Sequence, residues 1–396
     1  MNLGLQGRFS QIWVLDFEYQ ELNGNHPVVH CVVAREVFSG QLIRQWLSGE
    51  VDTHCPIPLG KDVLYVAYFA TAELKCHLAL DWPMPENVLD LYVEFRCLTN
   101  GLTLPAGANL LGALVYFGLT GIAYAEKNAM RELAIRGGPF NDAERIELTD
   151  YCQSDVEATS ALLPHLMGQR DLNQALLRGR YMRAAARVEH NGIPIDVKTL
   201  VRLQNNWDSI KEALIKRVDV NYGVFEGNTF KIQRFAAYLQ SNRIPWPRLT
   251  SGALDLKDDT FRQMAKVYPK LSPLRELRQS LGQLRLSKIH VGKDGRARTN
   301  LSPFRSRTGR NQPSTTSYIF GSSVWLRGLI KPSSGMGVAY IDWAQQEFGV
   351  AAALSGDSAM QAAYHSGDPY LNFAKQAGLV PPDATKQTHP GERNLC

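Results

Sequence analysis

Residues 338–347 read Val-Ala-Tyr-Ile-Asp-Trp-Ala-Gln-Gln-Glu. The first four residues form an apolar run, which ends at the carboxylate of Asp342. A short apolar run of this kind is typical of a buried β-strand. Such a strand would hold Asp342 at its exposed end, where a rigid scaffold can position a carboxylate to bind a divalent metal ion. Glu347 then begins an Ala-rich segment that predicts a helix. For Asp342 taken alone, an ordinary core strand before a helix explains the pattern without any catalytic role.

The longer string at 340–357, YIDWAQQEFGVAAALSGD, resembles motif A of the family A DNA polymerases (the bacterial polymerase I type), which usually reads DYSQIELRxxAxLSGD. The resemblance implies that Asp342 binds both catalytic Mg²⁺ ions of a polymerase site. It also implies that Glu347 excludes a ribose 2′-OH and that Gln345 lies with it at the nucleotide, so that deoxynucleotides are selected. Gly349 stands where the family usually has arginine, and no phosphate contact is inferred there.

Length and charge bound the organisation of the chain. At 396 residues it exceeds one compact domain and indicates two or three, and its 44% hydrophobic residues are enough for real cores. Between residues 275 and 310, ten Lys/Arg stand against two acidic residues, an excess that predicts a phosphate-binding surface. A solvated helix face explains Arg275 and Arg278 equally well, but it fits the part after residue 291 less well.

Cysteine usage and the absence of a leader point to the cytoplasm. The six cysteines are scattered without C-x-x-C spacing, which argues against zinc and against a disulfide framework. The start, MNLGLQGRFSQ, has no apolar core of signal-peptide length. Residues 97–125 are uncharged, but their glycines and Pro105 indicate a soluble core with a short helix that Gly118 ends. We expect a protein of the bacterial or phage-infected cytoplasm that makes no membrane contact.

Residues 12–18 predict a strand that carries two acids. Alternate residues of a strand project to the same face, so Asp16 and Glu18 lie together and Phe17 lies on the opposite face. Two carboxylates this close repel each other and shift their pKa values unless a cation lies between them. A D-x-E pair alone is common and is explained as a structural feature.

Two later helices carry further candidate residues. A second predicted strand leads into a helical run from Glu73 onward, with Thr71 as its N-cap. Residues 142–163 predict a helix on which Tyr151 and Asp155, spaced i, i+4, share one face. A surface contact explains this pair when it is taken alone.

Taken in order, these motifs resemble the DEDDy 3′–5′ exonucleases over the whole of residues 8–165. The resemblance implies an α/β RNase H-like fold with a mixed central sheet flanked by helices. It also implies two Mg²⁺ ions (with Mn²⁺ as a substitute), one generating hydroxide and one stabilising the leaving 3′ oxygen, while Tyr151 orients the attacking water. The implied metal ligands are Asp16, Glu18, Glu73 and Asp155.

The second of these motifs departs from the family pattern. It usually ends in aspartate within N-x3-D, whereas this chain has Tyr-Phe-Ala-Thr-Ala before Glu73. The extra methylene of a glutamate moves its oxygens, although a glutamate can still bind a metal ion. Asp90, in another predicted strand at 87–92, is the competing ligand.

Residues 166–300 predict a mainly helical thumb. The string RVEHNGIPID at 187–196 resembles RIExxGxxID, the entrance to the polymerase module of family A enzymes. Asn191 and Gly192 end one helix of this region and Asp196 caps the next. An unrelated helical bundle is the alternative interpretation. The predicted helices cover 171–190, 198–217, 228–240, 257–268 and 271–288.

A junction with three arginines follows. Residues 291–301 are hairpin-like with a turn at their Asp-Gly pair. The Thr-Gly-Arg of 308–310 resembles the family's TGR motif, which implies that Arg310 contacts the primer terminus. By the same resemblance Arg305 and Arg307 are phosphate or minor-groove contacts, which give affinity rather than sequence choice.

Residues 388–396 resemble the start of motif B, with Arg393 as the arginine that grips the incoming triphosphate. The lysine of that motif and the carboxylate of motif C are absent from the sequence. Because one aspartate cannot complete a two-metal polymerase site, we expect this polypeptide alone not to extend primers. We interpret the sequence as a truncated polymerase.

The whole sequence thus predicts a family A DNA polymerase with a proofreading exonuclease. The predicted domains are the exonuclease at 8–165, the thumb at 166–300 and the first part of an α+β palm at 301–396. The expected partners are primer–template DNA and single-stranded DNA 3′ ends, with dNTPs for the full-length parent, and the expected state is a monomer. The alternatives are an RNase D-like 3′–5′ exoribonuclease and a DNA-binding fragment whose exonuclease pocket is inactive.

Overall fold

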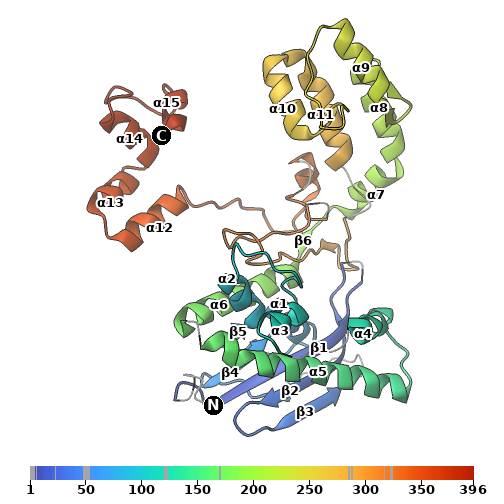
Figure 1. The fold of residues 1–396 in the computed structure, drawn as a ribbon, viewed down its shortest axis with the longest axis vertical. Coiled ribbons are helices and arrows are strands. Elements are labelled where there is room, and N and C mark those ends of the chain that lie inside the picture. Colours follow the sequence, from blue (N-terminus) through green and yellow to red (C-terminus); the bar gives the residue numbers. More distant parts are fainter. Residues whose placement is uncertain are drawn as a thin grey trace. The chain divides into compact units, whose positions relative to one another are not determined.

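The computed structural model divides into two compact units, Met1–Pro332 and Ser333–Cys396. Figure 1 shows the ribbon. The division falls after residue 332, so residues 301–332 belong to the first unit and not with the rest of the predicted palm. The structure describes residues 5, 7–22, 24–47, 54–119, 124–168, 171–283, 286, 289–315, 317–321 and 324–396, with backbone only at 124–127, 283, 324 and 325.

A five-stranded mixed sheet organises the N-terminal part of the first unit (Figure 1). Its order is β3-β2-β1-β4-β5, with β1 antiparallel to β2 and parallel to β4. The prediction of a mixed sheet, and of the strands near residues 12–18, 63–67 and 87–92, is confirmed. The strands are β1 (Gln11–Gln20), β2 (Val28–Glu36), β3 (Leu42–Trp46), β4 (Val63–Ala67) and β5 (Asn87–Asp90).

Six helices accompany this sheet. The longest, α5, begins with a capping box in which the Asn141 side chain accepts from Glu144 N and the Glu144 side chain accepts from Asn141 N. The helices predicted from 73, 110, 142 and 171 are all present. They are α1 (Ala70–Ala79), α2 (Leu91–Leu98), α3 (Leu110–Tyr116), α4 (Tyr124–Arg136), α5 (Asp142–Met167) and α6 (Leu172–Asn191).

The predicted N-cap of α1 is wrong. Thr71 lies buried inside the first turn, and its hydroxyl has no hydrogen-bond partner in the part of the chain that the structure describes. The cap position is Phe69, and the backbone N–H groups of Phe69 and Ala70 donate to the carboxylate of Asp90 at 3.2 and 2.8 Å. The side chain of Asp90, at the end of β5, therefore replaces a local cap. A local sequence pattern does not reveal such a contact between distant residues.

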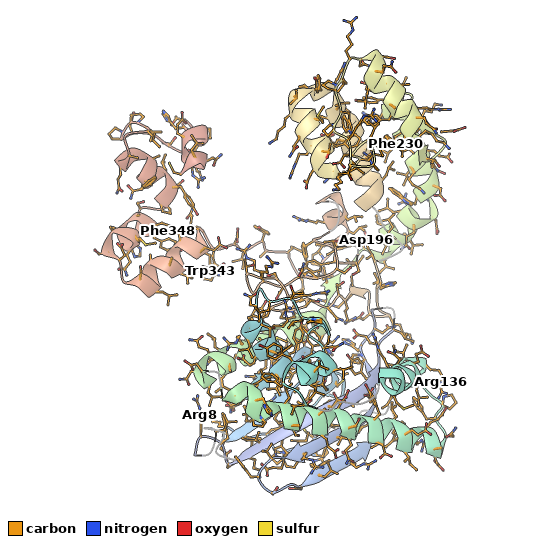
Figure 2. The ribbon with its side chains drawn as sticks, viewed as in Figure 1. Arg8, Arg136, Asp196, Phe230, Trp343 and Phe348 are labelled. Atoms are coloured by element: carbon orange, nitrogen blue, oxygen red, sulfur yellow. The ribbon has the colours of Figure 1, made fainter. Side chains whose placement is uncertain are left out.

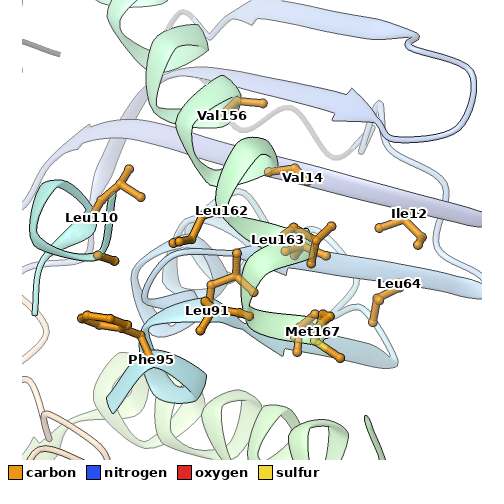
Figure 3. Close-up of a cluster of buried hydrophobic side chains, with 14 of the residues drawn as sticks. Ile12, Val14, Leu64, Leu91, Phe95, Leu110, Val156, Leu162, Leu163 and Met167 are labelled. Carbon is orange, nitrogen blue, oxygen red and sulfur yellow. The ribbon is translucent and has the colours of Figure 1, made fainter. Parts of the chain in front are cut away.

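The two faces of the sheet have separate cores. Even-numbered residues of β1, Ile12 and Val14, pack with α5 residues such as Leu163, as Figure 3 shows. Odd-numbered residues, Trp13 and Phe17 among them, pack in a second cluster with α1 and α6. On that side a Cβ at Gly179 of α6 would come within 1.8 Å of the Val88 carbonyl oxygen, so the close helix–strand approach requires glycine.

The next part of the first unit is mainly helical, as predicted. Its own core is built around stacked Phe235 and Phe261 rings, 5.3 Å apart. Asp196 caps the first helix by accepting from Thr199 N, which confirms that prediction (Figure 2). The single helix predicted at 198–217 is instead two, because the chain breaks at Asn206. The elements are α7 (Val197–Asn205), α8 (Trp207–Asp219), β7 (Phe225–Glu226), β8 (Thr229–Phe230), α9 (Ile232–Ser241), α10 (Asp258–Val267) and α11 (Ser272–Gln283).

Residues 289–312, here named the return segment, lead from these helices back to the sheet domain. β9 (Arg296–Ala297) pairs with β6 (Ile193–Pro194), and the Lys293 backbone N–H donates to Asn25 Oδ1 at 2.8 Å. A turn closed by Gly295 N donating to Gly292 O confirms the predicted hairpin-like shape. The return segment therefore belongs to the same compact unit as the sheet.

The second unit is helical, and the strand predicted at 338–341 is wrong. Tyr340 and Ile341 are 88% and 83% exposed, and no described strand pairs with these residues (Figure 2 shows the neighbouring Trp343). A strand needs a neighbour for its N–H and C=O groups, so an apolar run without one does not form it. The α+β character predicted for the palm is absent from this unit, whose elements are α12 (Gln346–Ser355), α13 (Ser358–His365), α14 (Pro369–Gln376) and α15 (Pro390–Leu395).

Within the described residues, no helix combines the length and apolar character needed to cross a membrane.

Two histidines stack where the return segment meets the sheet domain. The rings of His26 and His190 lie 4.0 Å apart with an angle of 29° between their planes. Arg298 donates to the His190 carbonyl oxygen at 2.7 Å and lies 2.9 Å from His26 Nε2. Burial, followed by the positive charges of His26 and Arg298, lowers the pKa of His190 to about 4.

The lowered pKa of His190 predicts that the free energy of unfolding depends on pH. The unfolded chain protonates this histidine near its ordinary pKa of about 6.5, so the stability of the neutral stack is present above that pH and is lost as pH falls toward 4. We expect His190→Phe, which keeps a ring but cannot be protonated, to lose less stability between pH 7.5 and pH 5 than the wild type. Urea midpoints measured at both pH values test this. His165→Phe, at an exposed position on α5, is the control, and an equal pH dependence in all three proteins would contradict it.

Candidate active site

Strand β1 presents two carboxylates on one face of the sheet. Asp16 and Glu18 are half-buried and lie on the side of Ile12 and Val14, which α5 covers, while Phe17 between them is buried in the opposite core. The pairing of β1 with β2 shifts register directly after Glu18. Such irregularities are frequent next to active sites, because they re-aim side chains at the end of a regular ladder.

Helix α5 brings Tyr151 and Asp155 to these carboxylates. The thiol of Cys152 donates to the Asp16 backbone carbonyl oxygen at 3.2 Å, which fixes the helix against β1. Burial raises the pKa of Tyr151 well above its usual value, and the negative charges of Asp155, Glu18 and Asp16 raise it further. The Tyr151 phenol also donates a hydrogen bond to Asp155 and is therefore held in its protonated form.

Glu73 completes the group from the first turn of α1. Its side chain is wholly buried, and burial raises its pKa, with the charges of Asp16, Glu18 and Asp155 adding to the effect. The Phe17 backbone N–H hydrogen-bonds the carboxylate and opposes this shift. Among the described residues, the other oxygen, Oε2, has no hydrogen-bond partner. The structure thus brings together the four acids that the sequence proposed as one site.

Asp90, the rival ligand, has a different role. It is the N-cap of α2, where it accepts from Val93 N at 3.2 Å, and it also accepts from the N–H groups of Phe69 and Ala70. Burial raises its pKa to about 6 although these hydrogen bonds oppose the shift. Through these hydrogen bonds to backbone donors of two helices, Asp90 joins the start of α1 to the start of α2.

The four carboxylates match a hard divalent cation in chemistry. Mg²⁺ prefers oxygen ligands, and an orphaned buried oxygen such as Glu73 Oε2 is a position that a cation would satisfy. In the part of the chain that the structure describes, no group of three or more His, Cys, Asp or Glu side chains is positioned to hold a metal ion. The four carboxylates repel one another when no cation lies between them. To hold a cation together, the four side chains would have to move closer to one another.

A cavity of about 360 Å³ opens beside the carboxylates. Asp16 and Asp155 lie in its wall, and the sequence interpretation missed most of its other residues. Three of these are aromatic, and Tyr92 contacts both others, with ring centroids 5.9 Å from Tyr68 and 5.2 Å from Phe69. The only local signal was the Tyr-Phe pair just before Glu73. The remaining lining residues are Asn109, Leu110, Thr159, Ser302 and Arg305.

The residues proposed for a polymerase site lie mostly in the second unit. Asp342 is exposed in a segment without helix or strand, Gln345 is the N-cap of α12 and Glu347 lies in its first turn. Arg393 on α15 donates to Asp368 Oδ2 at 2.6 Å. The described structure pairs Arg393 within its own unit and does not hold Asp342 on a rigid element.

The three proposed DNA-binding arginines lie in the first unit. All three are exposed. The carbonyl oxygens of Arg305 and Arg307 accept hydrogen bonds from the Arg96 and Asn100 side chains of the sheet domain, at 2.7 and 2.8 Å. Arg310 N donates to Ser306 Oγ within its own turn. Among the three, Arg305 lies at the cavity beside Asp16 and Asp155, which its motif did not indicate.

Comparison with solved structures identifies the class of fold. The chain is similar to the structure described as "POL domain of Pol1 from M. smegmatis complex with DNA primer-template and dNTP", with a TM-score of 0.59 and 15% identity. The likeness covers 97% of this chain and 66% of that chain. It shows that the fold of this chain is similar to that of a DNA polymerase POL domain.

A sequence comparison gives one particular relative. The chain is 24% identical over 196 residues to DNA polymerase I of Aquifex aeolicus (strain VF5). The match covers 49% of this chain and 33% of that protein, so the chain matches about a third of the length of this curated relative. No protein-family model matches the chain.

The different roles of Asp90 and Glu73 predict opposite effects on stability. Asp90→Ala leaves backbone N–H groups of two helices without an acceptor, and we expect the free energy of unfolding to fall by about 3 kcal/mol. Glu73→Gln removes a buried charge in repulsive surroundings, and we expect a higher Tm than the wild type in EDTA at pH 7.5. Differential scanning calorimetry of the three proteins tests both. An unchanged Tm for Asp90→Ala would show that it is not a cap.

Proposed function

We propose that the sheet domain is a metal-dependent 3′–5′ exonuclease of the DEDDy, RNase H-like type, acting on single-stranded DNA ends within a DNA polymerase I-like protein. The observation that carries the proposal is that the charges of Asp16, Glu18 and Asp155 act on both Glu73 and Tyr151, while Asp16 and Asp155 also line one cavity. The charges of Asp16, Glu18 and Asp155 all act on Glu73, so these side chains share one electrostatic environment. Groups with strongly shifted pKa values in a cavity are typical of catalytic sites.

Asp16, Glu18, Glu73 and Asp155 would hold two Mg²⁺ ions, for which Mn²⁺ could substitute. When bound, the ions would activate water and neutralise the charge that develops on the phosphate oxygens. Tyr151, kept protonated by burial and by the neighbouring carboxylates, donates to Asp155, and its phenol oxygen would orient the attacking water by accepting a hydrogen bond from it. In this role its phenol positions the water and takes no proton from it.

The cavity suits the terminal nucleotide of a DNA strand. Its volume of about 360 Å³ is within the range of small-ligand sites. Tyr68, Phe69 and Tyr92 line it, and aromatic side chains bind single-stranded bases by stacking without choosing a sequence. The Tyr68 hydroxyl donates to the Ala108 carbonyl oxygen at 2.6 Å, which holds its ring in place.

The remaining parts fit a polymerase I-like protein. The helices of 197–283 are the proposed thumb, and the second unit carries Asp342, Glu347 and Arg393 for primer–template DNA and a dNTP. The fold likeness and the partial identity to a DNA polymerase I support this assignment. Because Asp342 is exposed on an irregular segment, residues 1–396 alone are not expected to extend a primer.

Removing a carboxylate of the group should abolish the exonuclease. We expect Asp16→Ala and Asp155→Asn each to lower the rate of degradation of 5′-labelled single-stranded DNA by at least about 100-fold, because each removes a metal ligand. Denaturing gels with Mg²⁺ or with EDTA measure this. Asp150→Asn is the matched control, since Asp150 is on the same helix but pairs with Arg44. Parental activity in Asp16→Ala would contradict the proposal.

The same assay with an RNA strand of matching sequence separates the alternatives. Faster degradation of RNA would identify an exoribonuclease of the RNase D type. Binding of DNA without any metal-dependent shortening would identify a protein with an inactive exonuclease pocket. Degradation of DNA in EDTA at the same rate would exclude the two-metal mechanism.

Tyr151 should affect the rate less than the carboxylates do. We expect Tyr151→Phe to lower kcat about 10- to 100-fold with little change in KM, because the hydrogen bond to water is lost while the metal ligands stay. Single-turnover kinetics on the same DNA measure the chemical step directly. A loss as large as that of Asp16→Ala would mean that the phenol has another role.

A further inference from the structure

A second and larger cavity adjoins the exonuclease cavity. Its volume is about 730 Å³, and Glu21 and Gly24 of the sheet domain line it together with the return segment and the residues that follow that segment. Ser302 and Arg305 line both cavities, so the two meet at these residues. The larger cavity is mostly polar; its other lining residues are His290, Arg298, Thr299, Asn300, Gln312, Pro313, Ser314, Thr315 and Ser317.

Arg305 is the free cation at this meeting point. In the described part of the chain its guanidinium makes no hydrogen bond or ion pair, whereas Arg298 in the larger cavity is bound to Asp294. Arg305 and Tyr92 line the same cavity; burial raises the pKa of Tyr92, and the positive charges of Arg96 and then Arg305 oppose that shift. An uncommitted arginine between two cavities is suited to a phosphate group.

The turn that carries Arg305 is strained and held in place. Ser302 and Phe304 have φ angles of +48° and +57°, a region that residues other than glycine rarely occupy. Leu301 N donates to Glu189 Oε1 at 2.6 Å, and the Phe304 ring packs on Tyr181 at 5.5 Å. Such strain persists only where the surroundings enforce it, and it concentrates at functional sites.

A buried ion pair fixes the larger cavity to the catalytic helix. Lys75 lies two residues after Glu73 on α1, and its side chain is only 4% exposed. Its Nζ donates to Glu21 Oε2 at 2.8 Å and to Asn300 Oδ1 at 2.9 Å, and both partners line the larger cavity. The wall of that cavity is therefore attached directly to the helix that carries Glu73.

We propose that the two cavities form one path for single-stranded DNA and that Arg305 binds a backbone phosphate where they meet. The 3′-terminal nucleotide lies beside the carboxylates, and the preceding nucleotides occupy the larger cavity. Arg305 is thus a substrate-binding residue of the exonuclease, supplied from about 150 residues beyond Asp155. This inference rests on the proposed exonuclease function and deepens it.

Binding without cleavage tests the path. The probe is a 5′-fluorescein-labelled dT decamer, titrated by fluorescence anisotropy in EDTA against the full chain carrying Asp16→Ala, over a series of KCl concentrations. Adding Arg305→Ala should weaken binding about 10-fold and reduce the slope of log K against log [salt] by about 0.7, the value for one phosphate contact on a single strand. Arg305→Lys should retain most of the slope, because it keeps the charge.

Arg131→Ala, which removes an exposed arginine of α4 that lines neither cavity, is the matched control and should bind as its parent does. Equal binding by Arg305→Ala and Arg131→Ala, or no binding by the parent, would overturn the path. Tighter binding of an rU decamer with the same Arg305 dependence would overturn the assignment to DNA. A wild-type chain that fails to degrade DNA with Mg²⁺ would refute the proposed function separately, since the binding assay requires no cleavage.

In kinetic form, the path predicts a split between binding and chemistry. With the intact carboxylates and Mg²⁺, Arg305→Ala should raise KM for the decamer about 10-fold and change kcat less than twofold. A fall in kcat with an unchanged KM would place Arg305 in the chemical step and overturn its role in the path.

Discussion

Repulsion among four carboxylates is the constraint on which the N-terminal domain depends. Glu73 is wholly buried, has one oxygen without a hydrogen-bond partner among the described residues and is affected by the negative charges of Asp16, Glu18 and Asp155. A chain selected for stability alone would not keep such a group, because burying unpaired charge is costly. In the proposed metal-dependent function, a bound cation would offset this cost.

The rest of the domain holds these acids against their repulsion. Strand β1 buries alternate residues in two cores, which leaves Asp16 and Glu18 no freedom to leave their face. Helix α5 is fixed over them, and Asp90 sets the start of α1 through backbone hydrogen bonds. Apolar packing and helix caps outside the site thus stabilise the folded domain. Their contribution offsets the unfavourable free energy of the repulsion among the carboxylates.

The return segment makes the cavity beside Asp16 and Asp155 depend on residues far along the chain. Ser302 and Arg305 line this cavity, and Lys75 joins the same segment to helix α1 through Asn300. The sheet domain and the return segment therefore belong to one compact unit, which extends to residue 332. A strand of DNA bound by the return segment would lie next to the carboxylates.

The sequence by itself determined the strands β1, β4 and β5 and the helices α1, α3, α5 and α6 of the N-terminal domain, because periodic burial and capping are local patterns, whereas β2, β3, α2 and α4 were not predicted. It also named the four acids and Tyr151, since each lies on a recognisable strand or helix. Only the tertiary structure showed that Asp90 accepts hydrogen bonds at the starts of α1 and α2, placed Arg305 at the cavity beside Asp16 and left residues 338–341 exposed. These outcomes depend on which distant backbone groups and strands meet, and contacts between distant residues have no local periodicity from which to predict them.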